Sequence, residues 1–188
     1  MSAEVGAPLH IAAADNAVDI MKILIENGAE IDICDDYNDT PLHLATYHKS
    51  LDAMQLLLDS GANVNALSSD GYYPLSKAIT PWMGNIEPEV ILLLLKYGAD
   101  INAVSGTDAL PALHTAAELG EADIVKLLIE HGADINLEYD GLTPLDAAME
   151  EEQEEVIEIL RSLGAVNSLD EDHTDTSTDH SDSDTEYE

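Results

Sequence analysis

The sequence is poor in positive charge and contains only one cysteine. Its 188 residues include six Lys or Arg and 39 Asp or Glu, which gives a net charge of -33. Such an acidic chain repels nucleic acid and anionic membrane surfaces, whereas it attracts and steers a cationic partner. Because Cys34 has no second cysteine to pair with, an intramolecular disulfide is impossible, and a reducing compartment is expected.

Aromatic residues and long apolar runs are also scarce. Aromatic residues make up 4% of the chain and Phe is absent, so the core must consist of Leu, Ile, Val and Ala, which favours close-packed helices. The longest aliphatic run, residues 90–95, is too short to span a bilayer. No basic segment followed by an apolar stretch begins the chain, so no signal peptide is expected. These absences together predict a soluble, cytoplasmic protein.

Two short motifs recur along the chain with a common period. Gly-Ala pairs begin at residues 28, 61, 98, 132 and 164, with gaps of 33, 37, 34 and 32 residues. A second motif precedes each pair by about twenty residues: Ala-Pro-Leu-His at 7–10, Thr-Pro-Leu-His at 40–43, Tyr-Pro-Leu-Ser at 73–76, Pro-Ala-Leu-His at 111–114 and Thr-Pro-Leu-Asp at 143–146. Two independent motifs with one period indicate a repeat protein.

The recurring residues have physical roles in a helical repeat. Thr40 and Thr143 can cap a first helix, and the proline that follows each has its φ preset for a first helical turn. Apolar residues at helical spacing over residues 124–129 predict a second helix. The glycine that follows the second helix can adopt the left-handed conformation that ends it.

Over residues 5–165 these motifs resemble those of the ankyrin-repeat family. The resemblance implies an all-α solenoid of about five helix-turn-helix repeats with short hairpin-like fingers. The ankyrin-repeat domain would occupy residues 1–167, with repeats at about 5–34, 35–67, 68–104, 105–137 and 138–165. Repeat three carries an insertion at 81–86 between its helices, and repeat four has Pro111-Ala112 in place of Thr-Pro. The acidic outer surface of repeat five would close the stack.

Residues 168–188 hold almost only Asp, Glu, Ser, Thr and His, so we expect an acidic, Ser/Thr-rich disordered tail. Residues 166–188 carry nine acids and no Lys or Arg, which leaves a net charge of -24 on the rest of the chain. Ser181, Ser183 and Thr185 each have an acid three positions on, as sites for acid-directed kinases do. The tail would serve either as a mobile polyanion in binding or only for solubility.

The sequence offers no catalytic constellation. His10, His43 and His114 share one slot of the repeat, where the resemblance implies hydrogen bonds to the backbone rather than metal binding. The acids around Cys34 would disfavour its thiolate, so a nucleophile is not expected there. Phosphate-loop, nucleophile-elbow and zinc-protease motifs are absent. We therefore predict no enzyme activity, no cofactor and no metal site.

The resemblance implies that partners bind to a concave face made of finger tips and exposed positions of the first helices. Its signature places a set of acids, tyrosines and one histidine there, with a tryptophan in the adjacent insertion. These partner-binding candidates are Asp15, Asp36, Tyr37, Asp39, Tyr47, His48, Asp70, Tyr72, Trp82, Glu118, Tyr139, Asp140 and Glu150; the signature also places Thr80, Asp108, Leu119, Leu142 and Glu151 on this face. Acids interleaved with aromatic residues suit Lys and Arg side chains.

The sequence therefore predicts a monomer that binds a basic protein partner, and neither nucleic acid nor membrane. One interpretation is an inhibitor or immunity-type protein that masks a nucleic-acid-binding surface with carboxylates in the place of phosphates. Ankyrin inhibitors of Rel-type transcription factors are similar in plan, since an acidic tail follows their stack. The alternatives are a bacterial or viral effector acting in a host cytosol or nucleus, and a scaffold whose acidic tail is controlled by phosphorylation.

Overall fold

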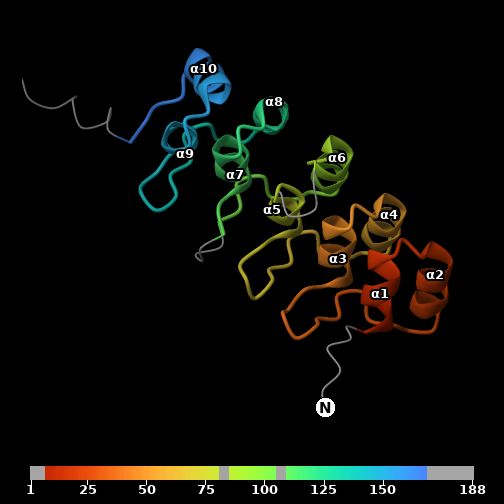
Figure 1. Cartoon of the computed structure of the whole chain (residues 1–188). Helices are drawn as coiled ribbons and strands as arrows, with labels where there is room; N and C mark the ends of the chain where they lie inside the picture. The colour runs from red at the N-terminus through yellow and green to blue at the C-terminus, as the bar shows by residue number, and fades with distance from the viewer. Residues whose placement is uncertain (1–6, 81–84, 105–108, 169–188) are drawn as a thin grey trace, which may run out of the picture.

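The computed structural model describes residues 7–80, 85–104 and 109–168. Within these ranges ten helices form five antiparallel pairs, which stack side by side into an elongated solenoid (Figure 1). The first helices of the pairs are α1 (Pro8–Ala14), α3 (Pro41–Tyr47), α5 (Pro74–Ala78), α7 (Ala112–Glu118) and α9 (Pro144–Glu150). The second helices are α2 (Val18–Glu26), α4 (Leu51–Asp59), α6 (Pro88–Lys96), α8 (Ala122–Glu130) and α10 (Glu154–Ser162). The predicted all-α solenoid is confirmed.

The first helices begin where the repeated motif predicts. The N–H of Asp146 donates to the Thr143 hydroxyl at 3.3 Å, and the Asp146 carboxylate accepts the Thr143 N–H at 2.8 Å, which forms a reciprocal capping box. In repeat two, the Thr40 N–H donates to Nδ1 of His43 at 3.0 Å. A proline occupies the first helical position in both repeats, where its missing N–H costs no hydrogen bond.

Each second helix is nine residues long and ends before a Gly-Ala pair. Gly61 follows α4 with a φ of 90°, a conformation that side chains with a Cβ rarely adopt. The fingers then run from each Gly-Ala pair to the next first helix (Figure 1). The described finger residues form no extended strand, and in the last finger Tyr139 and Leu142 make an isolated antiparallel bridge.

One apolar core runs through all five repeats, between the first and second helices. It is aliphatic, as the lack of Phe requires, and small alanines such as Ala45 and Ala116 let adjacent first helices approach closely. The largest fully buried side chains are Leu9, Met21, Leu42, Met54, Leu57, Ile79, Ile91, Leu94, Leu113, Leu128, Leu145 and Leu160.

A ladder of polar side chains joins neighbouring fingers. In each case a side-chain oxygen accepts a hydrogen bond from a backbone N–H of the next repeat. The pairs are Asp32 with Asn63 at 3.0 Å, Asn65 with Asp100 at 2.8 Å, Asn102 with Asp134 at 2.9 Å and Asn136 with Val166 at 3.0 Å. Each acceptor lies four residues after the glycine of its repeat. The polar segment after each Gly-Ala pair therefore fixes the spacing between repeats, because each bond crosses from one repeat to the next.

Repeat three departs from the others as its longer spacing predicts. Nine residues, Ile79 to Glu87, separate α5 from α6, whereas three residues separate the helices of each other pair. The α5 helix is also the shortest, with five residues. The insertion at 81–86 thus lies between the two helices, although residues 81–84, including Trp82, are outside the described residues.

The two ends of the stack differ in polarity. In the first repeat, Ile11, Ile20 and Ile23 are 46%, 55% and 59% exposed. At the other end, the acids of α10 face solvent. The Ser168 N–H donates to the Asp146 carboxylate at 2.9 Å, so the chain still contacts α9 one residue beyond the predicted domain end. The rest of the predicted tail lies outside the described residues.

Candidate functional site

The three histidines of the repeated motif connect one repeat to the next. Nε2 of His10 lies 2.9 Å from the Asp39 carbonyl oxygen, Nε2 of His43 lies 3.1 Å from that of Tyr72, and Nε2 of His114 lies 3.0 Å from that of Leu142. All three rings are at most 3% exposed. The expected structural role is confirmed, since each imidazole satisfies a carbonyl of the next finger.

The second ring nitrogen distinguishes His114 from His43. Nδ1 of His43 accepts the Thr40 N–H, whereas His114 follows Pro111, which has no N–H to donate at the equivalent position. The buried Nδ1 of His114 has no hydrogen-bond partner among the described residues, and the same holds for Nδ1 of His10. Burial lowers the pKa of His114, and the Leu142 carbonyl raises it by a smaller amount, so the neutral ring donates from Nε2.

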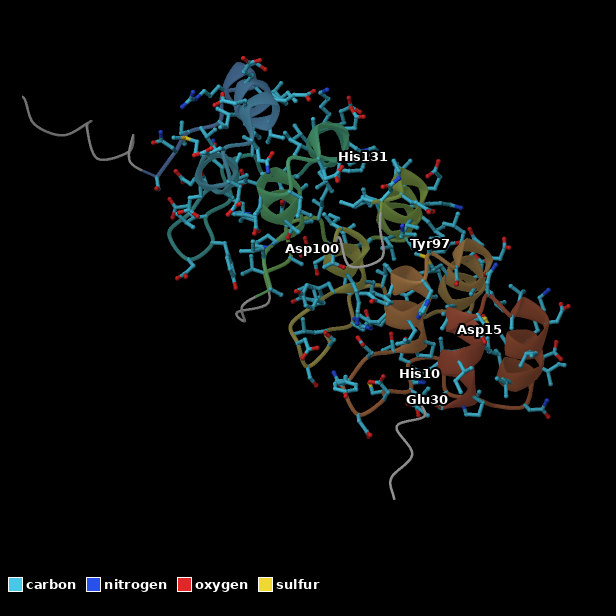
Figure 2. The ribbon with its side chains drawn as sticks, viewed as in Figure 1. His10, Asp15, Glu30, Tyr97, Asp100 and His131 are labelled. Carbon is cyan, nitrogen blue, oxygen red and sulfur yellow. The ribbon has the colours of Figure 1, made fainter. Side chains whose placement is uncertain are left out.

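The fingers and first helices together form a face that we call the inner face. It comprises α1, α3, α5, α7 and α9 with the described finger residues 29–39, 62–72, 99–104 and 133–142; the second helices form the outer face. In Figure 2, Glu30 and Asp100 lie in the fingers, whereas Tyr97 and His131 lie at the ends of α6 and α8.

Positive charge is almost absent from the inner face. Of the six cations, Lys22, Lys96, Lys126 and Arg161 lie on the second helices, and Lys49 lies in the turn after α3, where it pairs with Glu87. Only Lys77, on α5, belongs to the inner face. The described acids there are Glu30, Asp32, Asp35, Asp36, Asp39, Asp70, Asp100, Glu118, Asp134, Glu138, Asp140, Asp146 and Glu150.

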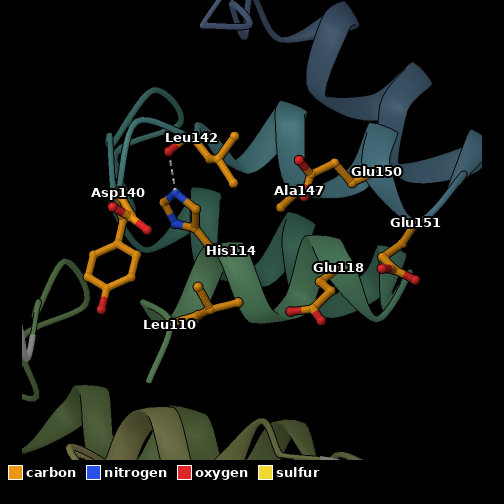
Figure 3. A pocket seen from close by; sticks show the side chains of 9 residues that line it. Leu110, His114, Glu118, Asp140, Leu142, Ala147, Glu150 and Glu151 are labelled. Atoms are coloured by element: carbon orange, nitrogen blue, oxygen red, sulfur yellow. Dashed lines mark hydrogen bonds between the residues drawn. The ribbon is translucent and has the colours of Figure 1, made fainter. Parts of the chain in front are cut away.

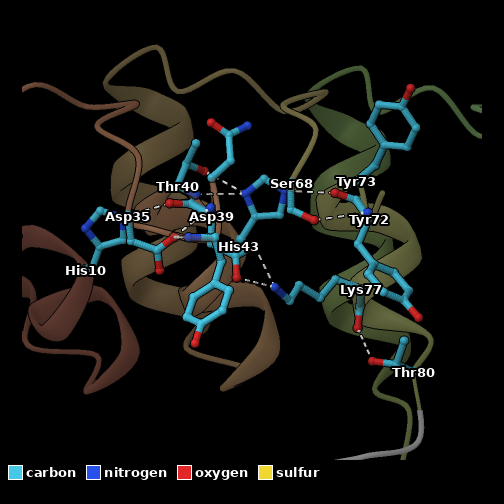
Figure 4. A network of polar contacts seen from close by, with 12 residues as sticks. His10, Asp35, Asp39, Thr40, His43, Ser68, Tyr72, Tyr73, Lys77 and Thr80 are labelled. Carbon is cyan, nitrogen blue, oxygen red and sulfur yellow. Dashed lines mark hydrogen bonds and ion pairs between the residues drawn. The ribbon is translucent and has the colours of Figure 1, made fainter. Parts of the chain in front are cut away.

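The one lysine of the inner face is neutralised within the chain (Figure 4). Nζ of Lys77 lies 2.6 Å from both carboxylate oxygens of Asp39, and the two side chains are only 16% and 14% exposed. Asp39, predicted to contact a partner, is therefore engaged in an internal ion pair. This pair lies beside His43, whose pKa is lowered by burial and by Lys77 but raised by Asp39, with burial the largest cause.

The other predicted partner-binding residues divide by their exposure. Tyr37, at the tip of the first finger, is 57% exposed. The remaining exposed candidates are Asp15, Asp36, His48, Asp70, Asp140 and Glu150; the half-buried ones are Tyr47, Tyr72, Glu118 and Tyr139. Asp15 and His48 end α1 and α3, at the boundary between the two faces. Trp82 and Asp108 lie outside the described residues.

Acids of two neighbouring repeats act on the same tyrosine. Burial raises the pKa of the Tyr72 hydroxyl, and the negative charges of Asp70 and Glu118 raise it further. Asp70 and Asp140 occupy equivalent positions in their fingers, three residues before the residue that caps the next helix. Carboxylates from repeats three and four therefore act on one side chain of the inner face, Tyr72.

A pocket of about 280 Å³ opens on the inner face between α7, α9 and the last finger. It brings together four of the predicted residues, Glu118, Tyr139, Asp140 and Glu150, with Leu142 and Glu151 beside them. In Figure 3, the three glutamates lie on one side, Asp140 on the other and His114 between them.

Three of the lining residues were not among those predicted to lie on the partner-binding face, namely Leu110, His114 and Ala147. His114 was assigned only a structural role by its place in the repeat. The edge of its ring meets the Tyr139 ring at a centroid separation of 6.3 Å, so the last finger rests on α7 at this point.

The described residues show neither a metal cluster nor a membrane span. No three His, Cys, Asp or Glu side chains among them are arranged to hold a metal ion. None of the described helices has the length and apolar character needed to cross a bilayer.

Comparison with known proteins agrees with the repeat architecture. The family model for ankyrin repeats matches residues 4–68 and 75–170. No curated protein matches the sequence. Five stacked helix pairs, the histidine and asparagine bonds between repeats, and a family match over most of the chain lead to one conclusion: this chain belongs to the ankyrin-repeat family, whose members are protein–protein interaction modules.

Proposed function

We propose that the inner face binds a basic surface of a partner protein without doing chemistry on it. The observation that carries the proposal is the segregation of charge: the single lysine of this face is paired with Asp39, whereas every other cation lies on a second helix or in the turn after α3. A partner that approaches the inner face therefore meets carboxylates of which, apart from Asp39, none is paired with a cation of this face. Such a field accelerates the encounter with a cationic protein and disfavours an anionic one.

Exposed aromatic residues add contact area to this charge. Tyr37 projects from the first finger with 57% of its surface exposed, and the half-buried Tyr47 packs edge-on against His48 at a centroid separation of 5.2 Å. Tyrosines in such positions are common anchors of protein interfaces because they bury a large area with little loss of side-chain entropy. The charge would thus set the kind of partner, and the tyrosines would supply much of the affinity.

The role we favour is inhibition: the inner face covers a surface with which the partner binds nucleic acid. Asp70 and Asp140 stand at equivalent, exposed positions of their fingers, so each presents a carboxylate to the kind of basic surface that binds phosphates. An immunity-type protein that neutralises a basic enzyme is one form of this role.

The experiment compares capture from native lysate on three immobilised proteins. The first is the wild type, the second carries Asp36→Asn, Asp70→Asn and Asp140→Asn, and the third carries the outer-face changes Glu130→Gln, Glu155→Gln and Glu158→Gln. The two variants lose the same charge, and all six acids are exposed. We expect a basic partner to bind the wild type and the outer-face variant, to be lost from the inner-face variant, and to elute at about 0.5 M salt.

Two outcomes would contradict the proposal. A partner that binds all three proteins equally does not use the inner face. A partner that is acidic, or is retained unchanged at high salt, is not recognised by charge. The inhibitory role is tested separately: the captured protein should lose its binding to nucleic acid when the wild type is added, and it should keep that binding when the inner-face variant is added.

A further inference from the structure

The geometry points to an arginine side chain of the partner as the occupant of the pocket between α7, α9 and the last finger. This assignment rests on the proposed function, and it adds which side chain is recognised and where. The pocket lies on the inner face, and its wall contains no Lys or Arg. Arg161, the nearest cation in the same repeat, contacts the sulfur of Met149 at 3.7 Å, and it does not line the pocket.

The acids of the pocket stand where they do not stabilise the helices that carry them. Glu118 and Glu150 are the last residues of α7 and α9, and Glu151 is the C-cap of α9. A negative charge at a helix C-terminus is unfavourable because it faces the negative end of the helix dipole. These carboxylates also repel one another across the pocket, so a bound cation would relieve two unfavourable interactions at once.

A second observation, independent of the carboxylates, is the unpartnered nitrogen of His114. The ring is 1% exposed, it lines the pocket, and its Nδ1 has no partner among the described residues. With Nε2 donating to the Leu142 carbonyl, Nδ1 is an acceptor. Pro111 supplies no N–H to satisfy it, unlike Thr40 for His43. The neutral ring between the acids therefore brings no positive charge to the wall, and its unused lone pair adds to the negative potential that a cation would meet there.

The shape and lining of the pocket favour arginine over lysine. A volume of about 280 Å³ exceeds the space that single waters need and admits a long side chain. Leu110, Leu142 and Ala147 provide apolar contacts for the methylene stem. Tyr139 offers a ring over which a planar cation can lie, and carboxylates stand on two sides. A guanidinium matches both the ring and the carboxylates, because it stacks on aromatic rings and donates up to five N–H hydrogen bonds in a fixed geometry. The ammonium group of lysine is a compact point charge and does not stack in this way.

The test is a titration of the full-length ¹⁵N-labelled chain, followed by amide chemical shifts, with N-acetyl-arginine amide as the probe. N-acetyl-lysine amide is the second cation, and N-acetyl-citrulline amide is the neutral isostere. We expect saturable shifts at residues 118, 139–142, 150 and 151, with a dissociation constant on the order of millimolar for so small a ligand. The lysine probe should bind several-fold more weakly, and the citrulline probe should cause no saturable shift.

A variant pair separates the pocket from the general charge of the chain. Glu118→Gln with Glu150→Gln should weaken binding of the arginine probe by roughly tenfold, whereas the outer-face pair Glu130→Gln with Glu158→Gln should change it less than about twofold. The pocket variant should melt no lower than the wild type, because both replaced acids end a helix. Weaker binding is therefore not the result of unfolding.

Several results would overturn the assignment. These are the absence of saturable shifts at the pocket, equal binding of the citrulline or lysine probe, and an equal effect of the two variant pairs. The proposed function fails differently, since its test is whether a basic protein is captured through Asp36, Asp70 and Asp140. If capture of a basic protein depends on those acids while the arginine probe does not bind, only the assignment of arginine to the pocket is wrong. If the probe binds but no basic protein is captured, only the proposed function falls.

Discussion

Replacing Lys77 with methionine removes the one cation of the inner face and leaves the Asp39 carboxylate without its partner. The two groups belong to different repeats and are nearly buried, with Nζ 2.6 Å from both oxygens and side chains 16% and 14% exposed. Methionine keeps most of the apolar stem and therefore most of the packing. The loss measured would thus come from the charge that remains on Asp39.

The size of the effect follows from this burial. Removing one member of a fully buried ion pair typically costs about 3–5 kcal/mol, because the other charge stays uncompensated. The pair here reaches solvent at its edge and water can partly solvate Asp39, so we expect about 2–4 kcal/mol. For a chain of this length, that loss lowers the melting temperature by about 5–15 °C.

The assay is thermal and urea denaturation followed by circular dichroism, with two controls. Lys126→Met is the same substitution at an exposed pair, where Lys126 and Asp123 are 47% and 96% exposed and 3.7 Å apart. It should cost less than about 0.5 kcal/mol. The double variant Asp39→Asn, Lys77→Met removes both charges and should recover most of the stability. If Lys77→Met costs no more than Lys126→Met, or the double variant is the least stable, the buried pair does not stabilise the stack as argued.

Three further predictions concern the turn after α7, the buried histidine and the tail. Gly120→Ala should cost about 1–2 kcal/mol, because Gly120 has a φ of 71° and an added Cβ would meet Gln153 Oε1 at 2.2 Å; a urea midpoint equal to the wild type would contradict this. Burial lowers the pKa of His43 below its ordinary 6.5, so the unfolded chain binds protons more readily and the stability that this residue contributes should fall as pH drops below about 6.5. The His43→Gln variant should lose less stability over that pH range. Parallel pH profiles of stability for wild type and variant would contradict the role given to His43. A chain ending after Ser168 should melt at the same temperature as the full chain or higher, since the deletion removes like charge and keeps the bond to Asp146; a clearly lower melting temperature would show that the tail supports the stack.

The fold was predictable because it repeats. The Pro-Leu motif and the Gly-Ala pair each mark a fixed place in the helix pair, so the starts of α3 and α9 and the glycine ends of the second helices followed from the residues alone. Even the long loop after α5 followed, from one gap of 37 residues among gaps of 32 to 34. Local capping and turn chemistry determine these features, and local chemistry is what a single sequence records.

The site was less predictable because it depends on contacts between repeats. Lys77 and Asp39 are 38 residues apart, and nothing in the local pattern around either one indicates their pairing. The unpartnered Nδ1 of His114 was equally hidden: the departure of Pro111 from the Thr-Pro motif was visible, but the hydrogen bonds of the buried ring require the folded geometry. The sequence placed Glu118, Tyr139, Asp140 and Glu150 on one face, whereas only the stacking of α7 against α9 brings them around one pocket.

The inner face, as proposed above, binds a basic protein through its charge. The most direct measurement is the association rate constant of the captured partner as a function of ionic strength, for the wild type and for the inner-face and outer-face variants. We predict that the association rate constant of the wild type falls by roughly tenfold or more between about 20 and 500 mM salt, and that the outer-face variant shows the same fall. The inner-face variant should associate slowly even at low salt. A rate that is independent of salt, or equal for the two variants, would contradict the account.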